Sequence, residues 1–347
     1  MMTTQVAFIF PGQGSQSVGM GADIFAASPA ARRVFETVDE TLGVSLSNLC
    51  FHGPEDTLRE TINAQPAIVT VSLALLAALQ EALSPHGSSW SSPLVPEYTA
   101  GHSVGAYAAL VASGALDLSD AVLLVRERGR LMHHEGTVCP GGMAAIIGMD
   151  EETLQEICQE ATSRTVATFP TETAGTRHPG EGQVAIANLN APGQIVISGE
   201  QRALALAMEL AKAGGAKRVI PLAVSAAFHS PVMQPAAVAL AKAIDAAAVH
   251  DATIPIIGNI NATPLTTERA IREELTWQIA ASVQWTRTIE YMASVGITTF
   301  IEIGPGQALA GMVRRIAKGA STINIGNMAE IEKAVPVVQE RGLLHKV

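Results

Sequence analysis

The sequence predicts an α/β protein in which a smaller domain interrupts a core built on a parallel sheet. Apolar strands alternate with helices at both ends of the 347-residue chain, the order typical of a parallel sheet. Between about residues 143 and 224 the order becomes β-α-β-β-α-β, which is typical of a ferredoxin-like domain. We therefore expect residues 1–142 and 225–347 to form the core and residues 143–224 to form the inserted domain.

Composition and charge narrow the class of protein. The formal net charge of −10 argues against broad binding to nucleic acid, which requires a basic surface. The three cysteines, Cys50, Cys139 and Cys158, lack metal-binding or redox spacing and are expected as reduced, buried thiols. The N-terminus lacks the basic region of a signal peptide, and the apolar run 67–79 is too short to span a bilayer. We therefore expect a cytoplasmic protein with no membrane partner.

The first 142 residues alternate between apolar segments and turns. The long helix expected near Pro66–Leu83 is apolar on every face, which predicts that it is buried. The helix over 117–136 is amphipathic, with Asp117 or Ser119 as its N-cap. The other expected segments are a buried strand at 5–10, a turn at 11–16, a helix at Pro29–Leu42, a surface loop at 84–93, a strand ending at Gly101 and a helix at 106–116.

The inserted segment and the C-terminal part complete the pattern. Within the insertion, residues 163–182 have the composition of an extended surface loop. The end of the chain, from about Ile331, is expected to be loosely held. The segments expected after the insertion are helices at Pro231–Ala247, Arg269–Ala280 and Thr286–Ser294, strands at 254–259 and 298–304, and a turn and helix beginning at Pro305.

The stretch GHSVG, residues 101–105, has the G-x-S-x-G spacing of a nucleophile elbow. It lies between a predicted strand and a predicted helix, which is the context that this motif requires. In such a turn, small flanking residues allow the sharp bend, and the serine stands at a helix N-terminus where backbone N–H groups stabilise an anion. The alternative is that Ser103 is simply a small residue at the start of a helix.

A serine nucleophile needs a base, and His229 is the best placed of the nine histidines. It lies in SAAFHSPV, after a predicted strand and before a predicted helix, where catalytic residues of α/β folds gather. His102 adjoins the serine, but neighbouring side chains on a sharp turn usually point apart. His133 and His134 lie near a helix end, and His178 lies in the predicted loop. A structural role for His229 remains the alternative.

Two further features lie near the elbow in the predicted fold. Arg128 follows Ser103 by 25 residues, about the length of one helix, a turn and part of a second, so its side chain can lie back over the serine. A solvated charge on a helix surface is the alternative for this arginine. PGQGSQ (11–16) follows a strand end, where glycines let backbone N–H groups approach a ligand, or where they form an ordinary tight turn.

Seven motifs in order give the chain a resemblance to malonyl-CoA:acyl-carrier-protein transacylases and the related acyltransferase domains of polyketide synthases. The similarity covers almost the whole chain, from about residue 5 to residue 327. The resemblance implies an α/β-hydrolase-like core with a parallel sheet and a ferredoxin-like insertion. The motifs are FIFPGQGSQ (8–16), GHSVG (101–105), RERGRLM (126–132), NLNAPGQIVISG (188–199), AAFHSPVM (226–233), SVQWT (282–286) and IEIGPG (301–306).

The resemblance also implies roles for individual residues. Ser103 corresponds to the acylated nucleophile, His229 to its base and Arg128 to the residue that grips the free carboxylate of the substrate. The pair has no carboxylate as a third member. The further residues that the resemblance implies are the backbone N–H groups of Gln13 and Val104 as an oxyanion hole, the Gln284 carbonyl orienting the histidine, Phe228 crowding an α-methyl group, and His102 beside the substrate.

The implied reaction moves malonyl from malonyl-CoA to the phosphopantetheine thiol of an acyl carrier protein, with no metal or redox cofactor. The implied pathway is fatty-acid or polyketide synthesis. The alternative is the transacylase step of malonate decarboxylase, because GHSVGA (101–106) also resembles the motif of that enzyme's transacylase subunit. Family members often carry an acidic residue where this chain has Ala106, which leaves substrate placement open. The alternatives are a serine thioesterase or hydrolase, with an Asp or Glu orienting His229 and water as acceptor, and a silent scaffold that only binds carriers.

Overall fold

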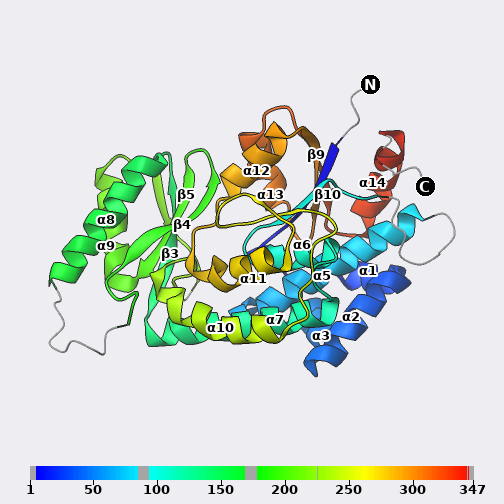
Figure 1. Ribbon diagram of the computed structural model, residues 1–347, viewed down its shortest axis with the longest axis horizontal. Coiled ribbons are helices and arrows are strands. Elements are labelled where there is room, and N and C mark those ends of the chain that lie inside the picture. Colours follow the sequence, from blue (N-terminus) through cyan, green and yellow to red (C-terminus); the bar gives the residue numbers. More distant parts are fainter. Residues whose placement is uncertain (1–4, 85–93, 169–177, 225, 342, 344–347) are drawn as a thin grey trace.

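Two separate β-sheets organise the protein in the computed structural model, which describes residues 5–84, 94–168, 178–224, 226–341 and 343. The larger sheet has six strands and the smaller has four (Figure 1). Helices pack on both faces of the larger sheet, whereas the smaller sheet and its two helices lie together at one end of the molecule. The predicted α/β class with an α/β-hydrolase-like core and a ferredoxin-like part is confirmed. The residue limits given above for the two domains stay a prediction.

The larger sheet has the order β10-β9-β1-β2-β7-β8. All neighbours are parallel except β8, which runs antiparallel to β7. In β1, Phe8 faces the helix-rich core while Ile9 belongs to the opposite cluster, so the strand is buried on both faces as its apolar sequence predicts. The strands are β1 (Gln5–Phe10), β2 (Tyr98–Gly101), β7 (Ile256–Ile257), β8 (Pro264–Leu265), β9 (Ile297–Ile303) and β10 (Ser321–Ile325).

The register of this sheet sets three loops side by side. Phe10 at the end of β1 lies opposite Gly101 at the end of β2, and the N–H of His102 donates to the Phe10 carbonyl (2.9 Å). On the other side of β2, Ala100 lies opposite Ile257 of β7. The loops that follow β1, β2 and β7 therefore emerge at the same edge, where ligands bind in open α/β sheets.

Helix α5 forms the centre of the helical layer and is longer than predicted. It begins at Thr61, so Pro66 lies inside it. Because proline has no N–H, the Ile62 carbonyl lacks its usual helical donor and instead accepts a hydrogen bond from Arg126 Nη1 (2.8 Å). The whole helix, unlike the shorter run 67–79, is long and apolar enough to cross a membrane, but 89% of its most apolar 18-residue stretch is buried in the protein. It is therefore a core helix.

The helices outside the smaller sheet are α1 (Ala22–Ala27), α2 (Pro29–Leu42), α3 (Leu46–His52), α4 (Glu55–Arg59), α5 (Thr61–Leu83), α6 (Gly105–Ala112), α7 (Leu118–Val138), α10 (Gln234–Ala246), α11 (Glu268–Trp277), α12 (Trp285–Ser294), α13 (Ala308–Ile316) and α14 (Met328–Glu340), with 3-10 turns η1 (Pro231–Met233) and η2 (Gln278–Ala280). The short helices α1, α3 and α4 had no counterpart in the sequence prediction.

The smaller sheet has the order β4-β5-β3-β6, and all its neighbours are antiparallel. Its elements follow the predicted β-α-β-β-α-β order, with both helices against one face of the sheet (Figure 1). A separate apolar cluster lies between sheet and helices. The elements are β3 (Gly141–Ile147), α8 (Glu151–Thr168), β4 (Val184–Ala191), β5 (Gln194–Glu200), α9 (Gln201–Ala213) and β6 (Arg218–Pro221).

Two predictions about loops were wrong. Residues 331–340 are not loosely held, because α14 buries Ile331, Ala334 and Val338 at helical spacing against the main core. The segment 163–182 is not all loop, since α8 continues to Thr168. Residues 169–177 of this segment lie outside the described part of the chain, and residues 179–182 form a tight turn. Residues 85–93 of the predicted loop 84–93 also lie outside the described part.

Candidate active site

Ser103 occupies a strained turn between β2 and α6, as a nucleophile elbow requires. Its φ of 54° lies in the left-handed region, which a side-chain-bearing residue rarely adopts. The flanking glycines have no room for a side chain: a Cβ at Gly101 would overlap the Gly105 backbone, and a Cβ at Gly105 would overlap the Phe10 carbonyl. The spacing G-x-S-x-G is therefore the spacing at which strand, turn and helix fit together.

His229 lies against Ser103 in hydrogen-bonding geometry. The Ser103 Oγ is 2.7 Å from His229 Nε2, and His229 Nδ1 lies 2.9 Å from the Gln278 carbonyl and 3.1 Å from the Ala281 carbonyl. Because carbonyl oxygens only accept, Nδ1 carries the proton and Nε2 accepts from the serine hydroxyl. The sequence prediction brought these two residues together from 126 positions apart, and the structure has them in contact.

Gln284 does not orient the histidine, which corrects the expectation from the resemblance. The carbonyls at His229 Nδ1 come from η2 and the residue after it, six and three positions earlier. The Gln284 carbonyl instead accepts the Thr288 N–H in the first turn of α12. Its own N–H donates to the Asn259 carbonyl (2.8 Å), so Gln284 holds a loop beside the elbow.

The surroundings of His229 keep its imidazole neutral. The side chain is buried, and burial together with the Arg128 cation lowers the pKa of His229 to about 3. The carbonyl hydrogen bonds at Nδ1 act in the opposite direction but are the smaller effect. A neutral imidazole with a free lone pair at Nε2 is the form that accepts a proton from a serine hydroxyl.

Arg128 is fully buried beside the Ser–His pair, which excludes the solvated-charge alternative. Its Nη1 donates to Gln65 Oε1 (2.7 Å), and its Nη2 donates to Ser103 Oγ (3.1 Å) and to Gln278 Oε1 (3.2 Å). Burial lowers the pKa of Arg128 to about 10, so the guanidinium stays charged at neutral pH. Among the described residues no carboxylate forms an ion pair with it, and its Nε has no partner.

Two residues at the same edge of the sheet, Gln13 and Val104, have backbone N–H groups without an acceptor among the described residues. Gln13 lies in the turn after β1, and Val104 directly follows Ser103 at the start of α6. Neither N–H donates a hydrogen bond to any residue that the structure describes. The Gln13 side chain is anchored by Thr61 Oγ1 (3.2 Å) and Gln65 Nε2 (3.4 Å). These N–H groups have the chemistry of an oxyanion hole.

The remaining predicted site residues flank this centre. His102 points its Nε2 toward Asn190 Oδ1 of β4 (2.8 Å) and packs edge-on against Trp285, so it joins the elbow to the smaller sheet. Burial lowers the pKa of His102, which favours the neutral ring. Phe228 is buried directly before His229. Its effect on acyl-group size stays a prediction.

Three polar residues at the site were missed by the sequence reasoning. Asn259 bridges the elbow, accepting the Ser103 N–H and donating to the Gly101 carbonyl, both at 2.8 Å. Gln278 contacts Arg128 through its side chain and His229 through its carbonyl, and Gln65 holds the other end of the guanidinium. Asn259 ends the predicted strand 254–259, so its place at a strand end was a usable signal. The two glutamines, inside or just after helices, gave none.

The His, Cys, Asp and Glu side chains of the described residues form no metal or redox centre at the site. Within the described residues, no three His, Cys, Asp or Glu side chains come together as metal ligands do. The three cysteines are free and buried, as predicted. Burial raises the pKa of the Cys50 thiol to about 12 and of the Cys139 thiol to about 11, which keeps both protonated and unreactive.

Known proteins resemble this chain over almost its full length. A malonyl CoA-acyl carrier protein transacylase from Bacillus subtilis is 43% identical over 338 residues, 97% of this chain and 98% of that protein. The crystal structure of an acyl-carrier-protein S-malonyltransferase from Bartonella henselae is 39% identical, with a TM-score of 0.86 over 97% of this chain and 100% of the other. A malonyl-transacylase in complex with its type II polyketide synthase acyl-carrier protein is 34% identical, with a TM-score of 0.84 over 96% and 100%.

A family model agrees with these individual relatives. The model for the acyl transferase domain matches residues 7–180 and 171–337, and these two ranges together contain every residue of the site described above. The family match and the full-length relatives at more than 30% identity therefore lead to the same assignment. The chain belongs to the acyl transferase family.

Proposed function

We propose that this protein transfers a malonyl group from malonyl-CoA to the phosphopantetheine thiol of an acyl carrier protein, through an acyl-serine on Ser103. The observation that carries the proposal is Arg128, a buried guanidinium in contact with the nucleophile and without a carboxylate partner among the described residues. A buried unpaired cation is costly unless an anion joins it. The free carboxylate of a malonyl group is such an anion, and a single CH2 group separates it from the reacting carbonyl.

The first half-reaction acylates the serine. His229 Nε2 takes the proton from Ser103 Oγ while the oxygen attacks the thioester carbonyl of malonyl-CoA. The tetrahedral oxyanion forms against the N–H groups of Gln13 and Val104, each such donor stabilising the transition state by about 3–4 kcal/mol. The intermediate collapses, the carbon–sulfur bond breaks, and His229 returns the proton to the leaving CoA thiolate.

The second half-reaction runs the same steps with a new thiol. The phosphopantetheine thiol of the carrier protein gives its proton to His229 Nε2 and attacks the malonyl-serine carbonyl. The same N–H groups stabilise the second oxyanion, and Ser103 leaves with the proton from His229. The relatives' names include both malonyl-CoA and acyl carrier protein, and one solved relative is bound to its carrier, which supports this choice of donor and acceptor.

Arg128 is proposed to select the acyl group. Its planar fork matches the two oxygens of a carboxylate better than a lysine would. An acetyl group would enter the site and leave the guanidinium without an anion, which lowers its transition-state binding relative to malonyl. The proposed cycle uses these side chains and the substrates' own groups and needs no cofactor of its own. We expect it to run in the cytoplasm, where free thiols such as those of this chain stay reduced.

Intact-mass measurement tests the proposal. Incubation with malonyl-CoA should add one malonyl group to the wild type and none to Ser103→Ala, and addition of a carrier protein bearing phosphopantetheine should remove it. Removal by water at the same rate, with or without the carrier, would indicate a thioesterase instead. The absence of any adduct would indicate a silent scaffold. The carrier that accepts malonyl fastest distinguishes fatty-acid or polyketide synthesis from the malonate decarboxylase pathway.

A further inference from the structure

We propose that Glu274 is a positioning residue for the nucleophile and acts through Asn259. This inference rests on the proposed acyl transfer at Ser103 and adds to it a residue that does not touch the reacting atoms. Glu274 lies on α11, far from Ser103 in the sequence, and the contact between them passes through the loop after β7. Two consecutive sets of hydrogen bonds make up this connection.

The first set joins Asn259 to the elbow. Asn259 Oδ1 accepts the Ser103 N–H and its Nδ2 donates to the Gly101 carbonyl, so one side chain bridges both ends of the bend. Asn259 is 1% exposed, so these contacts are buried. Ser103 is held at a φ of 54°, and such a conformation persists only where the surroundings determine it. The Asn259 bridge is one of those determinants.

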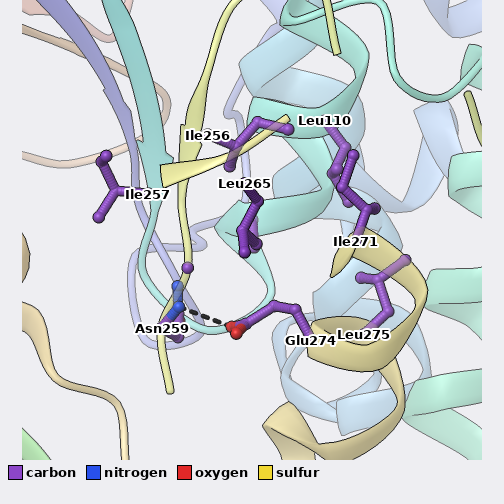
Figure 2. Close-up of a pocket in the computed structure, with 10 residues that line it drawn as sticks. Leu110, Ile256, Ile257, Asn259, Leu265, Ile271, Glu274 and Leu275 are labelled. Atoms are coloured by element: carbon purple, nitrogen blue, oxygen red, sulfur yellow. Dashed lines mark hydrogen bonds between the residues drawn. The ribbon is translucent and has the colours of Figure 1, made fainter. Parts of the chain in front are cut away.

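The second set joins Glu274 to the backbone that carries Asn259. Glu274 Oε1 accepts the Asn259 N–H at 2.6 Å and the Ile260 N–H at 3.3 Å, as the dashed line in Figure 2 marks for Asn259. Glu274 Oε2 packs so closely on Gly258 that a Cβ there would lie 2.8 Å from it. Three successive residues of this loop are therefore placed by one carboxylate.

Glu274 lines a mostly apolar pocket beside the elbow, which Asn259 also lines. The walls around it include Ala106, Leu110, Ile256, Leu265, Ile271 and Leu275 (Figure 2). Among the described residues that line the pocket, Glu274 is the only one with an ionisable side chain, and it is only 9% exposed. Burial raises the pKa of Glu274 to about 7, against the two backbone hydrogen bonds that lower it. A carboxylate is costly to bury in such a place, and here its acceptor capacity goes to the loop that aligns Ser103.

Glu302, on strand β9, provides a matched control for Glu274. It is 1% exposed, burial raises its pKa to about 7, and its two oxygens accept the N–H groups of Leu309 (3.1 Å) and Ala310 (2.7 Å). It therefore caps the start of α13 with the same chemistry by which Glu274 holds its loop. None of its hydrogen bonds leads to the elbow.

The test measures the rate of Ser103 acylation by malonyl-CoA with rapid quenching and intact mass, at a temperature where each variant is folded by circular dichroism. The variants are Glu274→Gln, which keeps one acceptor oxygen, Glu274→Leu, which keeps none, Asn259→Ala, the double variant Asn259→Ala with Glu274→Leu, and the control Glu302→Gln. We expect a graded loss in the saturating rate, a few-fold for Glu274→Gln and roughly 10- to 100-fold for Glu274→Leu. The malonyl-CoA concentration at half-maximal rate should stay nearly constant.

The double variant decides whether the effect passes through Asn259. If it does, adding Glu274→Leu to Asn259→Ala causes no further loss, and Glu302→Gln acylates at the wild-type rate. If Glu274→Gln and Glu274→Leu both acylate at the wild-type rate, the proposal is overturned. It is also overturned if the loss in the double variant equals the product of the losses in the two single variants. If Glu274→Leu does not fold, a loss in Glu274→Gln that Glu302→Gln matches overturns it as well. A wild type that never forms the adduct refutes the proposed function instead.

Discussion

Replacing Arg128 by alanine should change which acyl group this protein transfers. The side chain fills a buried site against Gln65, Ser103 and Gln278, and no carboxylate among the described residues balances its charge. The account assigns that charge to the malonyl carboxylate. Arg128→Ala therefore removes one partner of a buried ion pair in the malonyl complex, whereas the acetyl complex has no such pair to lose.

The size of the effect follows from burial. Removing one partner of a buried charge pair costs about 3–5 kcal/mol. Since about 1.4 kcal/mol corresponds to a tenfold change in rate, kcat/KM for malonyl transfer should fall by roughly 10²- to 10⁴-fold. Acetyl transfer should stay constant or rise, because an acetyl group no longer meets an unpaired guanidinium.

The assay compares acyl-serine formation from malonyl-CoA and from acetyl-CoA under the same conditions. Arg130→Ala is the matched control, because Arg130 lies on the same helix but is about half exposed and pairs with Glu127 at the surface (2.7 Å). This control should leave both rates unchanged, since a surface ion pair contributes little. If Arg128→Ala lowered the malonyl and acetyl rates by the same factor, Arg128 would not be the group that binds the carboxylate.

Three further predictions concern the elbow, the base and the buried carboxylates. Gly101→Ala should lower the free energy of unfolding by more than about 4 kcal/mol in a denaturant titration, because its Cβ meets the Gly105 backbone, whereas Gly311→Ala in α13 should be neutral or stabilising. Because the pKa of His229 is about 3, its NMR signals, assigned with His229→Gln, should not titrate between pH 5 and 8; a midpoint near 6.5 would contradict the burial argument. The folded-state pKa of Glu302, about 7, lies above its unfolded value, so the folded state holds a proton that the unfolded state releases. Its contribution to stability is therefore lost as pH rises from 5 to 8, by at most about 3 kcal/mol. Glu302→Gln should make the fall in stability with pH shallower and leave the part that comes from Glu274; equal slopes in wild type and variant would contradict the argument.

The sequence predicted the parts of the fold that depend on local pattern. The β-α-β-β-α-β run, the buried β1 and the all-round apolar α5 follow from periodicity and composition alone. The start of α5 was missed because Pro66 reads as a helix start, and only the distant Arg126 satisfies the carbonyl that this proline leaves free. The helix α14 was missed because its stability depends on packing its apolar face against the main core, and the sequence does not show that contact.

The site divides in the same way. Ser103, His229 and Arg128 lie in recognisable motifs, and the structure brings both His229 and Arg128 within hydrogen-bonding distance of Ser103 Oγ. The groups that orient them are backbone carbonyls and amide side chains, and of these only Asn259, at the end of a predicted strand, has a position that the sequence could indicate. The Gln284 expectation was wrong for this reason, because a carbonyl acceptor can come from any residue type and only the path of η2 decides which one faces His229.

The most direct test of the central claim is the location of the acyl group after a brief reaction with malonyl-CoA. The protein is quenched in acid, digested, and its peptides are sequenced by tandem mass spectrometry. The account predicts one malonyl group per chain, attached to the serine of GHSVG, at Ser103. A malonyl group on any other residue, or an unmodified Ser103 after turnover of malonyl-CoA, would contradict it.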